Sequence, residues 1–254
     1  MDSITELKSI VAKLRSPEGC PWDQEQTHES IRSQLIEETY EVIEAIDTKC
    51  DQSLREELGD VLLHIVFHAQ LAEERNAFDL AEVAKGINEK LIRRHPHVFG
   101  EDQAEDSAAV LKKWDELKKL EKPERTSVLD GIPASLPSLM KAQELQKKAA
   151  KIGFDWKVMK PVIAKIREEL DELEADLDHP ERAADEMGDV FFSLVNLCRH
   201  LKLDAEQCTQ QANQKFERRF RKLESLHPKM EDTSTHLSLE ELDRLWEKAK
   251  EEVG

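Results

Sequence analysis

The sequence predicts an all-α fold, and its composition supplies three reasons. Aromatic and turn-forming residues are scarce, with 8 Phe, 4 Trp, 1 Tyr, 8 Gly and 9 Pro in 254 residues, which disfavours sheets joined by hairpins. Charged residues make up 36% of the chain, as is typical of helices with long solvated faces. Hydrophobic residues make up 39%, which is enough for packed cores.

Charge and cysteine content indicate the environment and exclude some partners. The formal net charge of −17 argues against nucleic acid and anionic membrane surfaces as partners, because both require clustered cations. No apolar run approaches the ~20 residues of a membrane span, and the first residues lack the pattern of a signal peptide. The 4 cysteines form no Cys-x-x-Cys motif and are expected to be reduced. We therefore expect a cytoplasmic protein.

An acidic motif occurs twice. Glu-Glu-x-x-Glu at 37–41 recurs at 168–172, and Glu-x-Gly-Asp at 57–60 recurs at 186–189. Two further similarities follow in the same order, which predicts an internal repeat of two related helical domains. The matched pairs are 37–41 with 168–172, 57–60 with 186–189, 88–94 with 213–219, and Trp114 with Trp246.

Prolines and a glycine gather between the two copies. Three prolines and one glycine occur in residues 122–137, between segments of helical periodicity. We therefore predict a first helical domain at 1–122, a linker at 123–137 and a second helical domain at 138–254. Each domain is expected to be a short bundle of amphipathic helices.

The first acidic helix of each copy is amphipathic. Between 163 and 177 apolar residues keep helical core spacing, and Glu169 lies about 80° from the centre of that stripe, with Glu172 one turn further along. Glu168 points to the far side. Glu38, Glu41 and Glu37 repeat the arrangement in the first copy. On one helix alone, such acids are more often a solvated surface.

The second helix of each copy strengthens the case for a site. Residues 186–201 are apolar over most of the helix circumference, so this helix is expected to be buried. Glu186 and Asp189 lie on its remaining polar stripe, as Glu57 and Asp60 do in the first copy. Buried carboxylates are costly unless a Lys, an Arg or a metal ion meets them.

Facing helices with acids three residues apart can build a metal site from oxygen ligands. Such ligands without cysteine suit Mg²⁺, with Mn²⁺ as an alternative, rather than zinc. The two Glu-x-x-His strings, at 25–28 and 224–227, fall outside the acidic helices, which argues against a di-iron site.

Other residues of these helices have structural interpretations. Gly59 and Gly188 lie in mid-helix and are expected to mark close helix contacts. His64 and His68 could bind a transition metal, but the second copy has Ser193 and Leu197 in their places. A hydrogen-bonded structural role is therefore favoured for both histidines.

The third repeated element is basic. Lys215, Arg218 and Arg219 are matched by Lys90, Arg93 and Arg94, and the helix of the first copy should end at His95, before a proline. On spacing alone, ion pairing with neighbouring glutamates and phosphate binding are equally good interpretations. The conjunction with a carboxylate metal site favours Mg²⁺-bound polyphosphate.

Taken together, these motifs resemble the MazG family. The resemblance rests on the two acidic motifs, on Pro-Trp-Asp at 21–23, on Arg-Arg-His-Pro-His-Val-Phe at 93–99 and on Gly-Phe-Asp-Trp at 153–156. It implies an all-α, Mg²⁺-dependent enzyme, usually a homodimer, that converts a nucleoside triphosphate to the monophosphate and pyrophosphate. Broad use of ribo- and deoxyribonucleotides is expected.

The resemblance also implies roles for individual residues. We expect the second copy to be the active one, because Ser193 and Asn196 leave more room for a hydrated phosphate than His64 and Phe67 do, and because its basic helix continues past Arg219. The expected Mg²⁺ ligands are Glu169, Glu172, Glu186 and Asp189, with Glu168 as a further acid; the expected nucleotide contacts are Lys215, Arg218, Arg219 and Trp246; the alternative site of the first copy comprises Glu37, Glu38, Glu41, Glu57, Asp60, Lys90 and Arg94.

Two other functions remain open at this point. The protein could be a non-catalytic dimeric scaffold or regulatory protein whose acids are only charged surface. It could also be a narrower enzyme of the same superfamily that hydrolyses dUTP, dCTP or a phosphoribosyl nucleotide. Base preference would depend on loop residues that motif spacing cannot rank.

Overall fold

The computed structural model describes residues 2–103, 106–121, 126–227 and 237–253, and within these ranges every regular element is a helix. The predicted all-α fold is therefore confirmed. In chain order the helices are α1 (Ser3–Leu14), α2 (Pro21–Glu25), α3 (Arg32–Asp47), α4 (Asp51–Glu74), α5 (Leu80–Arg94), α6 (Pro96–Phe99), α7 (Ser107–Glu121), α8 (Ser138–Lys151), α9 (Met159–Ala175), α10 (Pro180–His200), α11 (Ala205–Leu226) and α12 (Leu239–Val253).

The chain divides into two compact units, Met1–Lys122 and Pro123–Gly254. The division falls at the start of the predicted linker 123–137, of which 123–125 lie outside the described residues. The described part of this segment has turns and no helix, as its prolines favour. Its Asp130 carboxylate accepts hydrogen bonds from two backbone N–H groups of the same turn, each at 2.9 Å.

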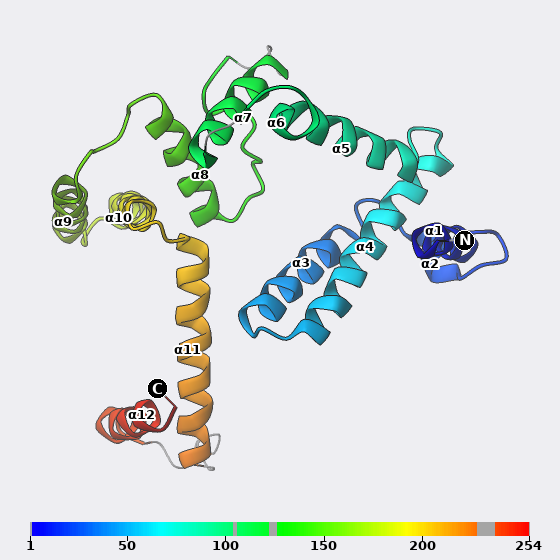
Figure 1. Ribbon diagram of the computed structural model, residues 1–254. Coiled ribbons are helices and arrows are strands. Elements are labelled where there is room, and N and C mark those ends of the chain that lie inside the picture. Colours follow the sequence, from blue (N-terminus) through cyan, green and yellow to red (C-terminus); the bar gives the residue numbers. More distant parts are fainter. Residues whose placement is uncertain (1, 104–105, 122–125, 228–236, 254) are drawn as a thin grey trace. The chain divides into compact units, whose positions relative to one another are not determined.

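The first unit is organised around α3 and α4, which lie side by side (Figure 1). Their connection turns at Lys49, which has a positive φ of 55°. α1 packs against the C-terminal half of α4 and closes the core there. The basic helix α5 ends at Arg94, with His95 as its cap, as the following proline led us to expect. The core consists of Val11, Ile31, Val66, Phe67 and Leu71.

Arg15 ties three segments of the first unit together. Its guanidinium donates to the backbone carbonyls of Asp23 and Gln26, the latter at 3.2 Å, and pairs with the Glu74 carboxylate at 2.8 Å. It also lies over the Phe67 ring, 5.3 Å from its centroid. The side chain is only 7% exposed. Arg15 therefore fixes α2 against α1 and α4.

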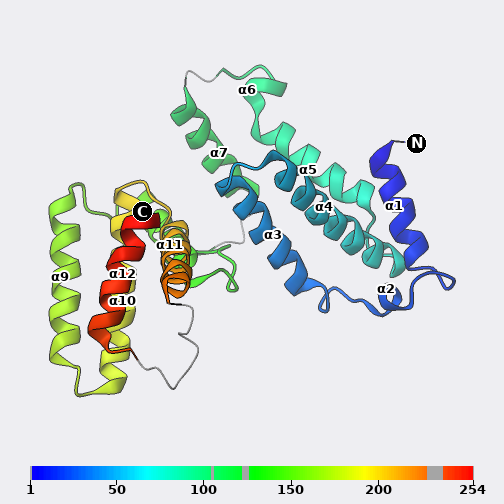
Figure 2. The same cartoon turned by 90° about the horizontal axis from the view of Figure 1, so that it is seen from below.

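The second unit is organised around α9 and α10, which lie side by side (Figure 2). α8 packs against α10 as well. Two buried glutamines of α8 connect the helices. Gln143 donates to the Leu203 carbonyl at 3.0 Å and accepts from the Ala205 N–H at 2.9 Å. Gln146 donates to the Phe192 carbonyl at 2.8 Å. α11 and α12 form a further helix pair within this unit.

The acidic helices are less buried than the sequence predicted. Phe191 of α10 is 53% exposed, and Met187 is 41% exposed. The prediction that Gly59 and Gly188 mark close helix contacts is wrong for a single chain, because a Cβ at either position would meet nothing within 4 Å. α9 covers one side of α10, and no described element of the chain covers the apolar side that carries these residues. α4 is likewise buried only in its C-terminal half.

Two observations concern the surroundings of the protein. Among the described helices, none is sufficiently long and apolar to cross a membrane. Cys20, Cys50, Cys198 and Cys208 are free thiols.

Replacing Arg15 with Met is expected to lower the free energy of unfolding of the first unit by roughly 2 kcal/mol, because two partly buried carbonyls lose their donor and Glu74 loses its partner. Lys8→Met is the control: its pair with Glu73, at 2.9 Å, is solvent-exposed, and its loss should cost about 0.5 kcal/mol. Urea denaturation monitored by circular dichroism measures both values. Equal losses in the two variants would contradict the role assigned to Arg15.

Candidate functional site

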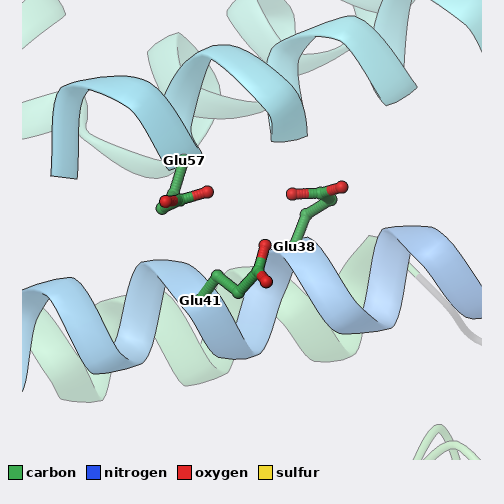
Figure 3. A group of neighbouring side chains, drawn as sticks. All are labelled: Glu38, Glu41 and Glu57. Carbon is green, nitrogen blue, oxygen red and sulfur yellow. The ribbon is translucent and has the colours of Figure 1, made fainter. Parts of the chain in front are cut away.

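Three acids of the first unit meet between α3 and α4. Glu38 and Glu41 lie one turn apart on α3, and Glu57 faces them from α4 (Figure 3). One carboxylate oxygen from each lies within 4.8 Å of those of the other two. The i, i+3 spacing on α3 places both glutamates on the side that faces α4. The arrangement predicted from helix periodicity thus brings these three side chains into one cluster, which we call the first acid cluster.

Crowding of like charges perturbs this cluster. Partial burial, and then the hydrogen bond and charge of Glu41, raise the pKa of Glu38 to about 7. Partial burial, and then the charge of Glu41, also raise the pKa of Glu57. No Lys or Arg among the described residues forms an ion pair with any of the three acids. At neutral pH the cluster therefore carries repelling carboxylates without a counter-charge from the described protein.

The second unit has a matching cluster on α9 and α10. Glu169, Glu172 and Glu186 each offer an oxygen within 4.8 Å of the others, and we call them the second acid cluster. Glu169 is the most buried, at 6% exposure. Its hydrogen bond to Glu172 is the main cause of the raised pKa of Glu172. Desolvation, followed by the charge of Asp189, raises the pKa of Glu186.

Lys165 distinguishes the two clusters. Its ammonium lies 2.9 Å from Glu169 and 2.6 Å from Glu168, and these contacts raise the pKa of Lys165 above its usual range. Four residues before Glu38, in the corresponding place of the first unit, the chain has Gln34. The second cluster is thus partly neutralised by its own chain, whereas the first is not.

The remaining predicted acids lie beside the clusters. Asp60 is close enough for its charge to raise the pKa of Glu38, and Asp189 lines the same cavity as Glu169. Glu37 lines the cavity of the first cluster, and Glu168 is exposed beside Lys165. These four acids are therefore neighbours of the clusters rather than members of them.

The basic residues of the two units differ in pairing. Arg93 and Arg94 both contact Glu121 of α7, the former at 2.7 Å, and this pairing lowers the pKa of Glu121 to about 2. In the second unit Lys215, Arg218 and Arg219 have no ion-pair partner among the described residues. Lys90 is exposed, without an ion pair in the described part of the chain.

The helix pair of α11 and α12 does not bring its expected nucleotide contacts to the acids of its own chain. Trp246 packs on Phe216, with ring centroids 5.2 Å apart. Neither Trp246 nor Lys215 nor Arg219 is among the residues that line the cavity beside the second acid cluster.

Each cluster borders a cavity. The first cavity, of about 400 Å³, is lined by Trp22 and Asp23 of α2 as well as by Glu38, Glu41 and His64. The second, of about 640 Å³, is lined by Trp156, Lys165, Glu169, Phe192 and Asn196 among others.

Sequence reasoning missed several of these cavity residues. Residues 21–23 and 153–156, which precede the acidic helices, were recognised as motifs but received no role. Each of these motifs places a Trp in a cavity wall, so the motifs themselves were the sequence signal for these wall residues. Lys165 and Gln146 carried no motif signal at all.

The histidines of the first unit form a local contact. His68 and His28 approach through their Nδ1 atoms at 2.8 Å, and their rings stack with centroids 5.1 Å apart. Desolvation, followed by the charge of His28, lowers the pKa of His68. One ring must donate and the other accept, so at most one of the two carries a second proton. This contact fits the structural role expected for His68.

Comparison with known proteins identifies the family. Residues 26–99 match the MazG nucleotide pyrophosphohydrolase domain. The chain is 50% identical over 246 residues to the nucleoside triphosphate pyrophosphohydrolase/pyrophosphatase MazG of Thermotoga maritima, covering 96% of this chain and 94% of that one. It is 45% identical over 258 residues to the nucleoside triphosphate pyrophosphohydrolase of Escherichia coli K12, covering 98% of each. An uncharacterised Bacillus subtilis protein, YabN, is 44% identical over 249 residues, which are 96% of this chain and 51% of that protein. The chain therefore belongs to the MazG family of nucleotide pyrophosphohydrolases.

Proposed function

We propose that the protein hydrolyses nucleoside triphosphates to nucleoside monophosphates and pyrophosphate, using Mg²⁺ or, alternatively, Mn²⁺. The named activity of its relatives supports the reaction, since two of them share at least 45% identity over almost the whole chain. The observation that carries the proposal is the pair of acid clusters, each with three carboxylates whose oxygens converge within 4.8 Å.

The donor atoms of both clusters fit a hard divalent cation. All are carboxylate oxygens, without cysteine or histidine, and oxygen donors are what Mg²⁺ and Mn²⁺ prefer. The raised pKa of Glu38, Glu57, Glu172 and Glu186 supports cation binding, because added positive charge would relieve the crowding of carboxylates. Mg²⁺ bound there would polarise phosphate oxygens and lower the pKa of a coordinated water.

The protein residues around the second cluster would complete the reaction. Glu168 lies beside Glu169 without belonging to the cluster, and we assign it the proton of the water that attacks the α-phosphorus. The bond from that phosphorus to its bridging oxygen then breaks, and pyrophosphate leaves. Lys215, Arg218 and Arg219 lack ion-pair partners among the described residues and lie outside the cavity of their own chain, so they would stabilise the charge on pyrophosphate from a second copy. Trp246 would lie against the nucleotide.

The proposal includes a homodimer. A single chain leaves Met187 and Phe191 of α10 exposed, and the glycine between them, Gly188, has open space beside it. A second copy that covered this face would remove its apolar side chains from water, and Gly188 would allow its backbone to approach closely. A second copy is also the candidate source of basic side chains for the second acid cluster, because those of α11 lie outside the cavity of their own chain.

We propose the second cluster as the catalytic one. Its cavity is the larger, and its unit has basic residues that are not neutralised by a glutamate, unlike Arg93 and Arg94. We further propose broad use of ribo- and deoxyribonucleotides. We also propose that the protein acts in the cytoplasm, because its 4 cysteines are free thiols, as is usual in a reducing compartment. The net charge of −17 makes nucleic acid an unfavourable partner.

Purified protein with Mg²⁺ should convert NTPs and dNTPs to monophosphate and pyrophosphate, measured by separating the products. Glu172→Gln should lower kcat on the order of 100-fold or more, because it removes a charged ligand from the second cluster. The matched Glu41→Gln variant, which alters the first cluster, should retain most activity. Loss of activity only in Glu41→Gln would move the catalytic site to the first unit. No turnover of any nucleotide by folded protein would refute the proposed activity.

Lys165 should weaken metal binding to the second cluster. Lys165→Gln, made in a Glu41→Gln background to isolate that cluster, should bind Mn²⁺ about tenfold more tightly, because a competing cation is removed. The reciprocal Gln34→Lys change, made in a Glu172→Gln background, should weaken binding at the first cluster by a similar factor. Calorimetric titration with MnCl₂ measures both. Unchanged affinities would show that Lys165 does not compete with the metal.

Metal-free protein should lose stability as pH rises from about 4.5 to about 7 through the titration of Glu38. The pKa of Glu38 is raised from 4.5 to about 7 in the folded state. Between these values the folded state still holds a proton that the unfolded state has released, so the free energy of unfolding falls as pH rises through this window. Glu38→Gln should flatten this part of the profile, and Mg²⁺ should restore stability at pH 8 in the wild type. Thermal melts with EDTA or Mg²⁺ test this. The same slope in Glu38→Gln and wild type would contradict the assignment.

A further inference from the structure

The two units contain helix pairs that can be compared position by position. α7 and α12 each have 15 residues, and a Trp is the eighth residue of both, Trp114 in one and Trp246 in the other. α7 packs against α5 and α12 packs against α11, and both of these longer-range partners begin after an aspartate N-cap. α5 carries the first arginine pair, Arg93 with Arg94, and α11 carries the second arginine pair, Arg218 with Arg219.

The last residue of the shorter helix differs in charge between the units. It is Glu121 in α7 and Val253 in α12. The Glu121 side chain is only 16% exposed, and its carboxylate accepts hydrogen bonds from Nε of Arg93 at 2.9 Å and from Nε of Arg94 at 3.1 Å. Val253 can make neither contact, because its side chain has no acceptor.

Arg219 shows the effect of this difference. Its Nε is buried and has no hydrogen-bond partner among the described residues, whereas Nε of Arg94 donates to Glu121. The neighbouring carboxylate of α12, that of Glu252, is engaged elsewhere, because it pairs with Lys222 at 2.6 Å. Lys222 lies on α11 because this helix runs for 22 residues, whereas a proline ends α5 after 15. In the part of the chain that the structure describes, the second arginine pair is thus left without a carboxylate.

A guanidinium that holds a carboxylate is closed to phosphate. Both anions accept hydrogen bonds from the same planar fork of N–H groups, so they compete for it. Glu121 belongs to the same chain and therefore has a high effective concentration at the first arginine pair. The pairing lowers the pKa of Glu121 to about 2, so its carboxylate stays charged at neutral pH. A phosphate that binds the first arginine pair would have to displace this carboxylate.

The two tryptophans report on the two arginine pairs. The guanidinium of Arg94 lies over the Trp114 ring, 5.5 Å from its centroid. Trp246 packs instead on Phe216, which precedes the second arginine pair on α11, with ring centroids 5.2 Å apart. Each ring thus lies beside the basic residues of its own unit.

We propose that the last residue of α7 and of α12 decides which unit binds phosphate through its arginines. Glu121 occupies the first arginine pair as an internal anion, whereas Val253 leaves the second arginine pair open to the phosphates of a nucleotide. The inference rests on the proposed nucleotide hydrolysis, which assigns the second arginine pair to the departing pyrophosphate. It adds that Glu121 is an autoinhibitory contact of the first unit and that this position of the helix is specificity-determining.

The test uses the full chain with a local probe in each unit. The chain has 4 Trp, and 5-fluorotryptophan labelling gives one ¹⁹F NMR signal for each of them. Trp114→Phe and Trp246→Phe assign the two signals of interest. The ligand is inorganic tripolyphosphate in EDTA, so that no base, metal ion or turnover contributes. In wild type, tripolyphosphate should shift the Trp246 signal and leave the Trp114 signal unchanged, and a shift of Trp114 alone would overturn the proposal.

Removing the charge of Glu121 should open the first arginine pair. In Glu121→Val the Trp114 signal should respond to tripolyphosphate with an affinity at least about tenfold above that of wild type, because the competing anion is lost. Glu121→Gln keeps the length of the side chain and should act in the same direction, which provides the test if Glu121→Val does not fold. Glu116→Gln, an exposed position of the same helix, is the matched control. An unchanged Trp114 signal in folded Glu121→Gln, or the same gain in Glu116→Gln, would overturn the proposal.

The reciprocal change should close the second arginine pair. Val253→Glu should lower the affinity reported by the Trp246 signal about tenfold, because the introduced carboxylate would compete with phosphate for the same guanidinium groups. Leu239→Glu adds the same charge at the other end of α12, where the side chain is 82% exposed, and should leave the affinity nearly unchanged. Equal losses in the two variants would reveal only a general effect of charge and would overturn the proposal.

A hydrolysis assay separates this inference from the proposed function. With Mg²⁺, Val253→Glu should lower kcat/KM for NTPs about tenfold, and Leu239→Glu should not. If Val253→Glu weakens tripolyphosphate binding but wild type hydrolyses no NTP, the inference stands and the proposed hydrolysis is refuted. If wild type hydrolyses NTPs but neither Val253→Glu nor Glu121→Gln changes tripolyphosphate binding, the proposed hydrolysis stands and this inference is refuted.

Discussion

Repulsion between carboxylates held across a helix pair is the constraint on which the rest of this structure depends. In each unit two helices pack so that three glutamates face one another, and the helical repeat leaves them little freedom to separate. The two units relieve the repulsion differently. In the first, Glu38 retains its proton up to about neutral pH; in the second, Lys165 supplies a positive charge. Carboxylates held this close cost free energy in the metal-free fold, as expected if they serve the proposed metal binding.

The acidic helices carry a second feature that a single chain does not explain. On α10 the acids Glu186 and Asp189 alternate with Met187 and Phe191, which are exposed. One helix therefore presents an acidic edge and an uncovered apolar face within a single turn. Binding of a cation and association with a second copy would order the same segment, so that the free energies of the two events would be coupled through α10.

Much of the acid clusters could be predicted because they depend on short-range geometry. Spacing of three residues places Glu169 and Glu172 on one helix face whatever surrounds them, and the second occurrence of the motif indicated that the pattern was not accidental. The end of α5 at Arg94 was predictable for the same reason, since proline acts on its immediate neighbour.

Features that depend on tertiary packing could not be predicted. Glu121 reaches Arg93 and Arg94 from α7, more than a helix away in sequence, and no spacing rule connects them. Whether an apolar helix face is covered by its own chain is equally invisible in periodicity, which explains the wrong expectation for Gly188. The hydrogen bond from the buried Gln146 amide to the Phe192 carbonyl, which joins α8 to α10, likewise has no signal in the sequence.

Lys165 also has a consequence for how the two clusters respond to the supply of ions. The Lys165 ammonium is held one helical turn from Glu169 and therefore has a high effective concentration there. A divalent ion that binds Glu169 would have to displace this ammonium. The first cluster has no such competitor among the described residues. If both clusters bind Mg²⁺ as proposed, they would have different filling thresholds, and as free Mg²⁺ rises the cluster on α3 and α4 would load before the cluster on α9 and α10.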